Sequence, residues 1–290
     1  MNLAQSDVRP AATTAAWVVA VKGSGSERKP DRLVAEEPLE IRISSPGEEA
    51  RPLAITMRTP GHDFELAAGF VLSEGLARGS QDIISIRYCR PRGESQLYNI
   101  VTVELVGPLP PTAPRAISNS SCGLCGKSTL EELALSLEPV PEEPVIAASV
   151  LCSLPDRLRR GQRVFGQTGG LHAAGVFDAS GKRFLVREDV GRHNAMDKVI
   201  GASLLRNAGA WGAPKGHRPL ESAVVMVSGR VGFEIVQKAA AAGVSVLAAV
   251  SAPSSLAVQA AEKVGMTVAG FLRDNHFNLY SNPQRVDLEN

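Results

Sequence analysis

The sequence lacks the long apolar segments that a membrane protein or an exported precursor carries. No apolar run approaches the ~18 residues that span a bilayer, and residues 1–10 contain no apolar stretch behind a basic one. Charge of one sign is missing too, because 31 Lys and Arg residues balance 30 acidic ones, for a net charge of +1. We therefore expect a cytoplasmic protein that binds neither membrane nor nucleic acid, and any anionic ligand must be held by a local site.

Cysteine is scarce, and the usual metal and nucleotide motifs are absent. There are four cysteines, with no second C-x-x-C and no H-x-x-x-H, so we predict no metal site. Cys89 and Cys152 lie in apolar or strand-like runs and are predicted to be buried small hydrophobes. Neither G-x-x-x-x-G-K-[ST] nor a G-x-G-x-x-G after a strand occurs, which disfavours ordinary NTPase and dinucleotide folds.

The one cysteine pair that is present is the C-x-x-C of Cys122 and Cys125. It lies in a run of small residues, and the Ser and Glu spacing of 128–132 predicts a helix start directly after it. A helix N-terminus and the neighbouring Lys127 both favour a thiolate. A structural disulfide, a zinc half-site and a reactive pair compete here; the reactive pair leads, because cytosolic disulfides are reduced and further zinc ligands are missing. The motif alone does not separate dithiol redox from sulfur transfer.

Apolar spacing predicts an α/β chain. Residues 223–272 alternate apolar strands with helices, and a glycine ends each helix, which favours a layered α/β domain over 109–290. Residues 1–108 read as a smaller β-rich part with a hairpin and one helix capped by Asp63. Residues 23–32 read as a polar loop, and the proline-bearing connections 108–114 and 138–144 as mobile links. Outside 223–272, strands are predicted over 15–22, 39–43, 53–57, 83–89, 97–106, 171–177 and 183–187, and helices over 147–160 and 193–207.

Polar residues gather where predicted strands end and helices begin. Arg230 follows one strand, Arg192 and His193 begin a helix, and residues 273–276 follow the last long strand. Ligands of open α/β sheets collect at strand carboxyl ends, and helix N-termini hold phosphates, so these segments suit a phosphate-bearing ligand. Surface pairing of His193 with Asp197, or of Asn194 with Lys198, is the structural alternative. His172 comes after two glycines at a predicted strand start. The alternative to a role as ligand or base is a core histidine whose hydrogen bonds are satisfied within the protein.

Deaminase chemistry is disfavoured by motif order. Zinc nucleobase deaminases carry H-x-E and later P-C-x-x-C, with the glutamate as general acid and base. Here C-x-x-C comes first, Ser121 stands in place of the proline, and Ala174 stands in place of the glutamate.

Seven blocks of sequence occur in order between Val34 and Arg285: TPGHDFELAAGF, SSCGLCGK, TGGLHAA, REDVGRHNAMDK, SGRVGFEIVQKA, AVSAPSSLAV and GFLRDNHFNLYSNPQR. In these blocks the chain resembles the FdhD family of formate dehydrogenase accessory sulfurtransferases. The resemblance implies a cytidine-deaminase-like α/β fold without deaminase activity, and a homodimer. It also implies a cytoplasmic sulfur carrier that takes sulfur from a cysteine desulfurase. The sulfur passes to the bis(molybdopterin guanine dinucleotide) molybdenum cofactor before this cofactor enters formate dehydrogenase.

The resemblance also assigns residues. The family's persulfide-bearing pair corresponds to Cys122 and Cys125, with Cys122 preferred. The family's stretch that binds the guanine-nucleotide portion of the cofactor corresponds to Phe271, Leu272, Arg273, Asp274, Asn275 and His276. Members commonly carry a serine where this chain has Gly232, so a hydroxyl is missing there. The alternative is a chaperone that binds the molybdenum cofactor or a guanine nucleotide without transferring sulfur. A zinc-bound structural module is a third possibility.

Overall fold

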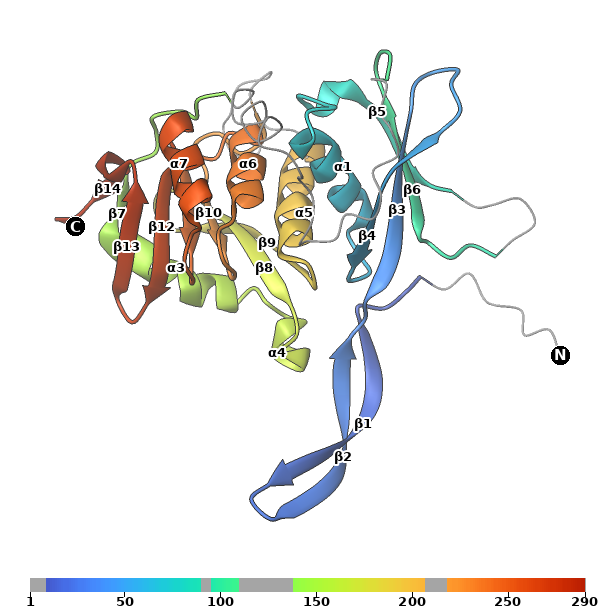
Figure 1. The fold of residues 1–290 in the computed structure, drawn as a ribbon, viewed down its shortest axis with the longest axis horizontal. Coiled ribbons are helices and arrows are strands. Elements are labelled where there is room, and N and C mark those ends of the chain that lie inside the picture. The colour runs from blue at the N-terminus through green and yellow to red at the C-terminus, as the bar shows by residue number, and fades with distance from the viewer. Residues whose placement is uncertain (1–8, 90–94, 110–137, 207–217, 290) are drawn as a thin grey trace.

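The computed structural model describes residues 9–89, 95–109, 138–206 and 218–289. It contains a two-stranded arm, a four-stranded sheet covered by one helix, and a six-stranded sheet with helices on both faces (Figure 1). The chain is thus of mixed α/β class.

The arm is a regular antiparallel hairpin of β1 (Thr13–Lys22) and β2 (Gly25–Val34). The loop predicted over 23–32 is therefore wrong beyond the turn, because most of that segment is strand. Its residues are nearly all exposed, so β2 has no buried face to give the alternating pattern by which strands are recognised.

The four-stranded sheet has the order β4-β3-β6-β5 and confirms the predicted hairpin. Its strands are β3 (Glu37–Ser44), β4 (Arg51–Arg58), β5 (Ile83–Tyr88) and β6 (Ile100–Leu105), with the 3₁₀ turn η1 (Ser80–Asp82) before β5. Alternate apolar side chains of β3 and β6 pack against α1 (Asp63–Ser73). The N-cap of α1 is His62, in the left-handed region, and not Asp63 as predicted.

The six-stranded sheet has the order β13-β12-β11-β10-β8-β9. Its strands are β8 (His172–Phe177), β9 (Arg183–Asp189), β10 (Val224–Val227), β11 (Val246–Ala249), β12 (Thr267–Arg273) and β13 (His276–Ser281). β10, β11 and β12 are parallel, whereas β8, β9 and β13 each run antiparallel to a neighbour. The predicted strands of 223–272 are confirmed. β13 was not predicted, although its alternation of His276 and Asn278 with apolar residues is the pattern of a half-buried strand.

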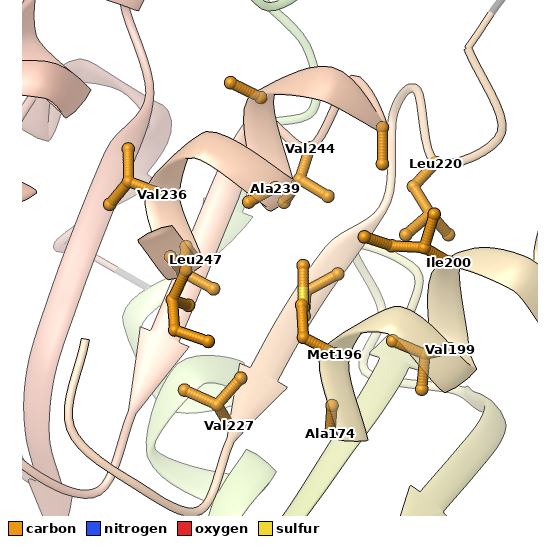
Figure 2. Close-up of a cluster of buried hydrophobic side chains, with 14 of the residues drawn as sticks. Ala174, Met196, Val199, Ile200, Leu220, Val227, Val236, Ala239, Val244 and Leu247 are labelled. Atoms are coloured by element: carbon orange, nitrogen blue, oxygen red, sulfur yellow. The ribbon is translucent and has the colours of Figure 1, made fainter. Parts of the chain in front are cut away.

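Strand residues alternate between two cores on opposite faces of this sheet. Val225, Val227 and Leu247 pack with α5 (Arg192–Leu205), α6 (Phe233–Ala241) and α7 (Ser255–Val264), and Figure 2 shows part of this cluster. Val224 and Met226 face α3 (Ala148–Arg159), the predicted helix with Pro155 inside it. The short elements α4 (Phe165–Thr168), β7 (Ile146–Ala147), η3 (Pro283–Arg285) and β14 (Val286–Asp287) complete the described chain.

Helices α1 and α5 cross in backbone contact and join the two sheets. A Cβ on Gly69 would overlap the carbonyl of Asp197, and a Cβ on Gly201 would overlap the carbonyl of Glu65. Only glycine permits so close an approach of two helix backbones. The segment before α5 is thereby held against the segment before α1.

The connection 138–144 is anchored, which makes the expectation of a mobile link there wrong. Arg285 donates to the carbonyls of Pro141 and Glu142 at 2.7 and 2.6 Å, and Arg218 donates to Pro139 at 2.8 Å. The backbone N–H of Val140 donates to the carbonyl of Val264 at the end of α7. Proline-rich composition suggested mobility, but the distant arginines that fix this segment were not visible in its local sequence.

Candidate functional site

The predicted persulfide pair, Cys122 and Cys125, lies outside the described residues, as do the helix start expected after it and the link over 110–114. The site can therefore be built only from the ligand-binding candidates.

Several polar candidates meet at one end of the six-stranded sheet, where its parallel strands reach their carboxyl ends. β8 begins at His172, which pairs with Asp189 at the end of β9, and β10 ends just before Ser228. The hydroxyl of Ser228 accepts a 2.8 Å hydrogen bond from the N–H of Ala173 and fixes the following Gly229 and Arg230 against β8. Helices α5 and α6 begin at this same end of the sheet. This is where ligands bind in open α/β sheets.

His172 lies at the centre of this group and is half-buried. A Cβ on Gly229 would stand 3.2 Å from His172 Nδ1 and 3.8 Å from the Cβ of Arg192, so the glycine permits close packing of the loop on the imidazole. Burial lowers the pKa of His172, and the positive charges of Arg192, His193 and Arg230 lower it further, against the opposing charge of Asp189. The imidazole is thus kept neutral among cations, able to donate one hydrogen bond and accept another.

Arg192, His193 and Arg230 lie around His172 in different states of pairing. His193 Nε2 lies 2.9 Å from Glu234 Oε2 on α6. This hydrogen bond is the main cause that lowers the pKa of Glu234, and burial opposes it. Arg230 is exposed, and the Nε of Arg192 is buried with no hydrogen-bond partner among the described residues. Because an unpaired buried donor costs about 1–3 kcal/mol, an acceptor placed there would be favoured.

The second group of candidates forms the β12–β13 connection. Arg273 pairs with His276, and the two residues between them, Asp274 and Asn275, have φ of 51° and 55°. Two successive positive φ angles define a type I′ hairpin turn, which Asp and Asn tolerate, so Asp274 has a conformational role whatever it contacts. These four residues are exposed.

Phe271 and Leu272 precede this turn and differ from it in exposure. Phe271 has φ 58°, within a register shift between Gly270 and Arg273. The side chain of Leu272 is fully buried in the core, so only its backbone could meet a ligand. β11 separates β10 from β12, so the Arg273 turn and Arg230 lie roughly 10 Å apart across the sheet, two strand spacings.

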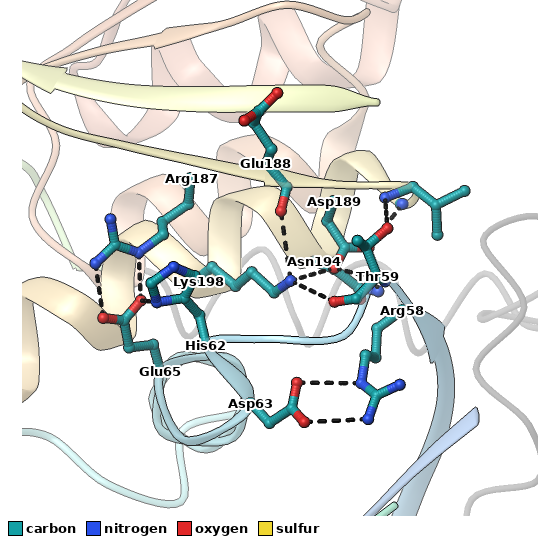
Figure 3. Close-up of polar contacts among 12 residues, drawn as sticks. Arg58, Thr59, His62, Asp63, Glu65, Arg187, Glu188, Asp189, Asn194 and Lys198 are labelled. Atoms are coloured by element: carbon teal, nitrogen blue, oxygen red, sulfur yellow. Dashed lines mark hydrogen bonds and ion pairs between the residues drawn. The ribbon is translucent and has the colours of Figure 1, made fainter. Parts of the chain in front are cut away.

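The rest of the REDVGRHNAMDK block is structural. Lys198 Nζ lies 2.6 Å from Asp189 Oδ2, and both side chains are buried (Figure 3). Asp197 pairs with Lys238 of α6 at 2.9 Å, and Asn194 donates to the carbonyl of Met57 at 2.7 Å. The surface pairings considered for this block are therefore wrong, because its charged residues have buried partners distant in sequence.

These buried pairs were missed because their partners are not neighbours in the chain. Lys238 lies 41 residues from Asp197, and Glu234, the partner of His193, also comes from α6. The only available signal was the position of a lysine and a glutamate inside an otherwise apolar helix pattern.

Gly232 is the N-cap of α6, with φ −89° and open space where a Cβ would stand. None of the side chains that the structure describes caps this helix end. A serine at this position would be suitably placed to cap α6, since serine is a favoured N-cap residue. The missing hydroxyl therefore has a helix-capping explanation that needs no ligand.

The two described cysteines are half-buried and free, less buried than predicted. Cys89 Sγ lies 2.9 Å from the hydroxyl of Thr102, so it takes part in a polar contact. Within the described ranges, no group of three or more His, Cys, Asp or Glu residues could hold a metal ion. None of the helices in those ranges is both long and apolar enough to cross a bilayer.

The fold and the candidate site define a class: a mixed α/β protein with a local cationic group at the carboxyl ends of its parallel strands. The chain belongs to the FdhD/NarQ family, whose sequence model matches residues 34–287.

Similar proteins cover nearly the whole chain. It is 46% identical over 273 residues to the sulfur carrier protein FdhD of Nocardia farcinica, covering 93% of each chain. It is 47% identical to the protein of the same name from Streptomyces coelicolor, covering 93% of this chain and 94% of that one. A crystal structure of a candidate formate dehydrogenase accessory protein from Desulfotalea psychrophila has the same fold, with a TM-score of 0.71 at 22% identity over 95% of this chain and 99% of that one.

Proposed function

We propose that this protein is a cytoplasmic sulfur carrier that serves formate dehydrogenase. It receives sulfur from a cysteine desulfurase as a persulfide on Cys122 or Cys125 and passes it to the bis(molybdopterin guanine dinucleotide) molybdenum cofactor, its substrate. The observation that carries the proposal is 46–47% identity over 93% of the chain to two proteins named as sulfur carriers. The C-x-x-C segment supplies the required thiols. We also propose that the layers are arranged as in cytidine deaminases.

The first chemical step is a thiol–persulfide exchange. The thiolate of Cys122 attacks the outer sulfur of the desulfurase persulfide, a new S–S bond forms on Cys122, and the desulfurase cysteine leaves as a thiolate. No oxidant is consumed, because the sulfane sulfur keeps its oxidation state. A persulfide is a reversible state of a low-pKa thiol, which suits a carrier. Delivery of the sulfur to the cofactor as sulfide takes two electrons, which the second thiol of the pair supplies. The thiolate of Cys125 attacks the inner sulfur of the Cys122 persulfide, a Cys122–Cys125 disulfide forms, and the outer sulfur leaves as hydrosulfide to the cofactor.

The cationic group at the carboxyl ends of the parallel strands supports the cofactor-binding half of the proposal. The guanine dinucleotide arms are anionic, and a net charge of +1 supplies no general attraction. Arg192, whose buried Nε has no partner in the described part of the chain, and the exposed Arg230 and Arg273 offer charge-assisted donors at strand ends. Neutral His172 could donate or accept beside them. Two such groups roughly 10 Å apart suit a ligand with separate phosphate and base portions.

The sulfur-transfer half is tested by persulfide loading. The protein is incubated with a desulfurase and cysteine, and intact-mass spectrometry detects the addition of one sulfur atom. We expect loading on the parent and on Cys152→Ser, and its loss when Cys122 and Cys125 are both changed to Ala. Each single Cys→Ala variant should keep its thermal stability and fail to mature formate dehydrogenase. Full loading of the double variant would refute the assignment, and a large thermal destabilisation would point to a structural or metal role.

The binding half is tested by calorimetric titration with GDP as a fragment of the cofactor. Arg273→Ala should weaken binding about ten- to a hundredfold, since a hydrogen bond to a charged group is worth roughly 1.5–3 kcal/mol. Lys263→Ala is the matched control, because Lys263 lies in the last turn of α7, far from the strand carboxyl ends; this variant should bind GDP as the parent does. Unchanged GDP affinity in Arg273→Ala would remove this residue from the site.

The same variants separate the proposal from its alternative, a cofactor-binding chaperone without sulfur transfer. A specific observation favours considering it: the charged residues that act on His172 among the described residues are Arg192, His193, Arg230 and Asp189, and no cysteine is among them. If the double cysteine variant still matures formate dehydrogenase in cells while Arg273→Ala does not, the chaperone is the correct function.

A further inference from the structure

Positive charge is concentrated at the end of α3 and in the turn between β8 and β9. Four of the seven residues from 157 to 163 are arginine. The turn adds a lysine and an arginine, and the whole set, here called the basic face, is Arg157, Arg159, Arg160, Arg163, Lys182 and Arg183. The chain has a net charge of only +1, so this local excess does not follow from its composition.

Hydrogen bonds join the two segments of the basic face into one surface. Arg183 donates to the carbonyl of Arg157 at 2.8 Å, and Arg157 donates to the carbonyl of Gly181, the residue before Lys182. Two of the six guanidinium and ammonium groups thus hold the end of α3 against the β8–β9 turn. The remaining cations are carried by a fixed framework.

The basic face follows the edge strand β9 for most of its length. At one end of β9, a Cβ on Gly161 would stand 3.1 Å from Nη1 of Arg183. At the other end, Glu188 accepts hydrogen bonds from the N–H groups of Val164 and Phe165 at 3.0 and 2.7 Å. Five strand steps separate residues 183 and 188, so the face is about 17 Å long. An extended peptide of about five residues has this length.

Four cations of the basic face have no polar partner within the described part of the chain. Their side chains are exposed and make no hydrogen bond or ion pair with a described residue: Arg159, Arg160, Arg163 and Lys182. Basic residues favour the C-terminal end of a helix, which accounts for Arg159 in the last turn of α3. Arg163 and Lys182 lie outside this helix, so the helix dipole does not explain them.

The carboxylates near the basic face do not neutralise it. Both oxygens of Glu188 accept backbone N–H groups. Asp178 accepts from the N–H groups of Ser180 and Lys182 at 2.9 Å each. Asp156 is exposed on α3 and forms no ion pair with a described residue. Like charges crowded on one surface repel each other, and a complementary negative surface relieves this repulsion.

The charge of the whole chain favours a protein partner over nucleic acid. Domains that bind nucleic acid commonly have a pI above about 9, whereas this sequence has a pI of about 7.7. Guanidinium groups match the geometry of carboxylates, which they bind through two parallel hydrogen bonds. A strip of this length is smaller than a standard interface, so we expect a transient contact that salt weakens.

We propose that the basic face docks an acidic segment of a partner protein. Arg159, Arg160 and Arg163 bind its carboxylates from the chain after α3, and Lys182 binds them from the β8–β9 turn. The proposal goes beyond sulfur transfer and does not depend on it. Arg183 pairs with Phe177 at the far end of β8 from His172, so the basic face is separate from the candidate site.

Fluorescence anisotropy with a labelled peptide of ten glutamates, used as the probe, tests this docking. The parent should bind the peptide at low ionic strength and progressively less as salt shortens the Debye length. Arg160→Gln/Arg163→Gln/Lys182→Gln should weaken binding about tenfold, because it removes three exposed charge pairs. The matched control Lys22→Gln/Lys29→Gln/Lys263→Gln removes the same charge from exposed residues elsewhere and should bind as the parent does.

Competition experiments separate the basic face from other anion sites. Excess GDP should not displace the peptide, because the candidate site for the cofactor lies elsewhere. No binding to the parent at low salt, equal loss in the two triple variants, or displacement by GDP would each overturn the proposal. Tighter binding of a ten-nucleotide oligothymidylate, lost in the same basic-face variant, would overturn it in favour of nucleic acid.

Cross-linking of the parent gives a readout that needs no variant. A carbodiimide couples a carboxylate to an amine, so it should join the glutamate peptide to Lys182 ahead of Lys263, which is equally exposed by class. Peptide mapping by mass spectrometry identifies the modified lysine. Equal labelling of the two lysines would overturn the proposal. Thermal unfolding midpoints of both triple variants should match the parent, since only exposed side chains are changed.

Discussion

At the scale of single residues, the clearest feature is Lys198, a charged side chain held where water is excluded. It is 1% exposed, its Nζ lies 2.6 Å from Asp189 Oδ2, and it donates to the carbonyl of Thr59 at 2.9 Å. The backbone N–H of Thr59 in turn donates to Asp189. The pair therefore ties the start of α5 to the loop between β4 and α1.

Lys198→Met should destabilise the protein strongly, because it leaves the buried Asp189 carboxylate without its counter-charge. Loss of one partner of a buried pair costs about 3–5 kcal/mol. Urea unfolding measures the difference. Arg87→Gln is the control, since Arg87 forms a half-exposed pair with Glu104 that contributes roughly 0–1 kcal/mol. A loss in Lys198→Met no larger than in the control would mean that the pair is dispensable.

Acid stability should depend on Glu65, which binds Arg187 and lies 3.2 Å from His62 (Figure 3). Burial acts to raise the pKa of Glu65, but the hydrogen bonds and charges of Arg187 and His62 outweigh it and lower the pKa to about 2 from 4.5. A carboxyl whose folded pKa is depressed contributes stability that is present above its unfolded pKa and lost as pH falls through the folded value.

Parent and Glu65→Gln should therefore differ most above pH 5, by up to about 3 kcal/mol, and converge between pH 4.5 and 2. Denaturant unfolding across this range provides the measurement. A difference that stays constant with pH would show that the carboxyl contributes only through its shape. Arg42→Gln, which removes the partner of Glu40 on the other side of the sheet, controls for the loss of any carboxylate pair.

At the scale of elements, the α1–α5 crossing rests on two glycines. Gly201→Ala should destabilise by about 1–3 kcal/mol, because the added methyl would overlap the Glu65 carbonyl and force the helices apart. Gly166→Ala is the matched control in α4, where no atom of the described residues lies within 4 Å of the added Cβ. The control should be neutral or slightly stabilising, as alanine favours helix. Equal midpoints of the two variants in thermal unfolding would contradict the close approach.

Sequence predicted those elements whose burial leaves a local pattern. The strands of 223–272 are apolar on both faces and the helices between them carry one apolar stripe, so their order and most bounds are confirmed. β2 was missed because it has no buried face to leave such a pattern. β13 does carry an alternating pattern, so its omission was an error of interpretation and not a lack of signal. α5 was recognised as a helix, yet it is buried nearly all round, and the partners of its charges come from β9 and α6.

The same limit applies to the candidate site. The rule that ligands bind at strand carboxyl ends grouped Arg192, His193 and Arg230, and these residues do lie around His172. The rule could not show that Asp274 and Asn275 form a hairpin turn or that Leu272 is buried, because both depend on the pairing of β12 with β13.

At the scale of the whole molecule, the two sheets share packing through α1. Leu66 and Val71 belong to the core of the four-stranded sheet, whereas Ala68 and Leu72 pack with Met196 in the core of the six-stranded sheet. One helix thus completes two cores. The division of the chain into 1–108 and 109–290 stays a prediction, and this sharing determines what the division means for stability.

We expect both sheets to unfold in one cooperative transition. Neither core can open while the other stays intact, because separating α1 from α5 would expose Ala68, Leu72 and Met196 and leave the Lys198–Asp189 pair without its contacts to Thr59. Differential scanning calorimetry should therefore give a calorimetric enthalpy equal to the van't Hoff enthalpy, the signature of two-state unfolding. Scans at several protein concentrations separate out any contribution from association. Two resolved transitions at every concentration would show that residues 1–108 and 109–290 fold independently, and that the shared helix contributes less than the internal packing of each sheet.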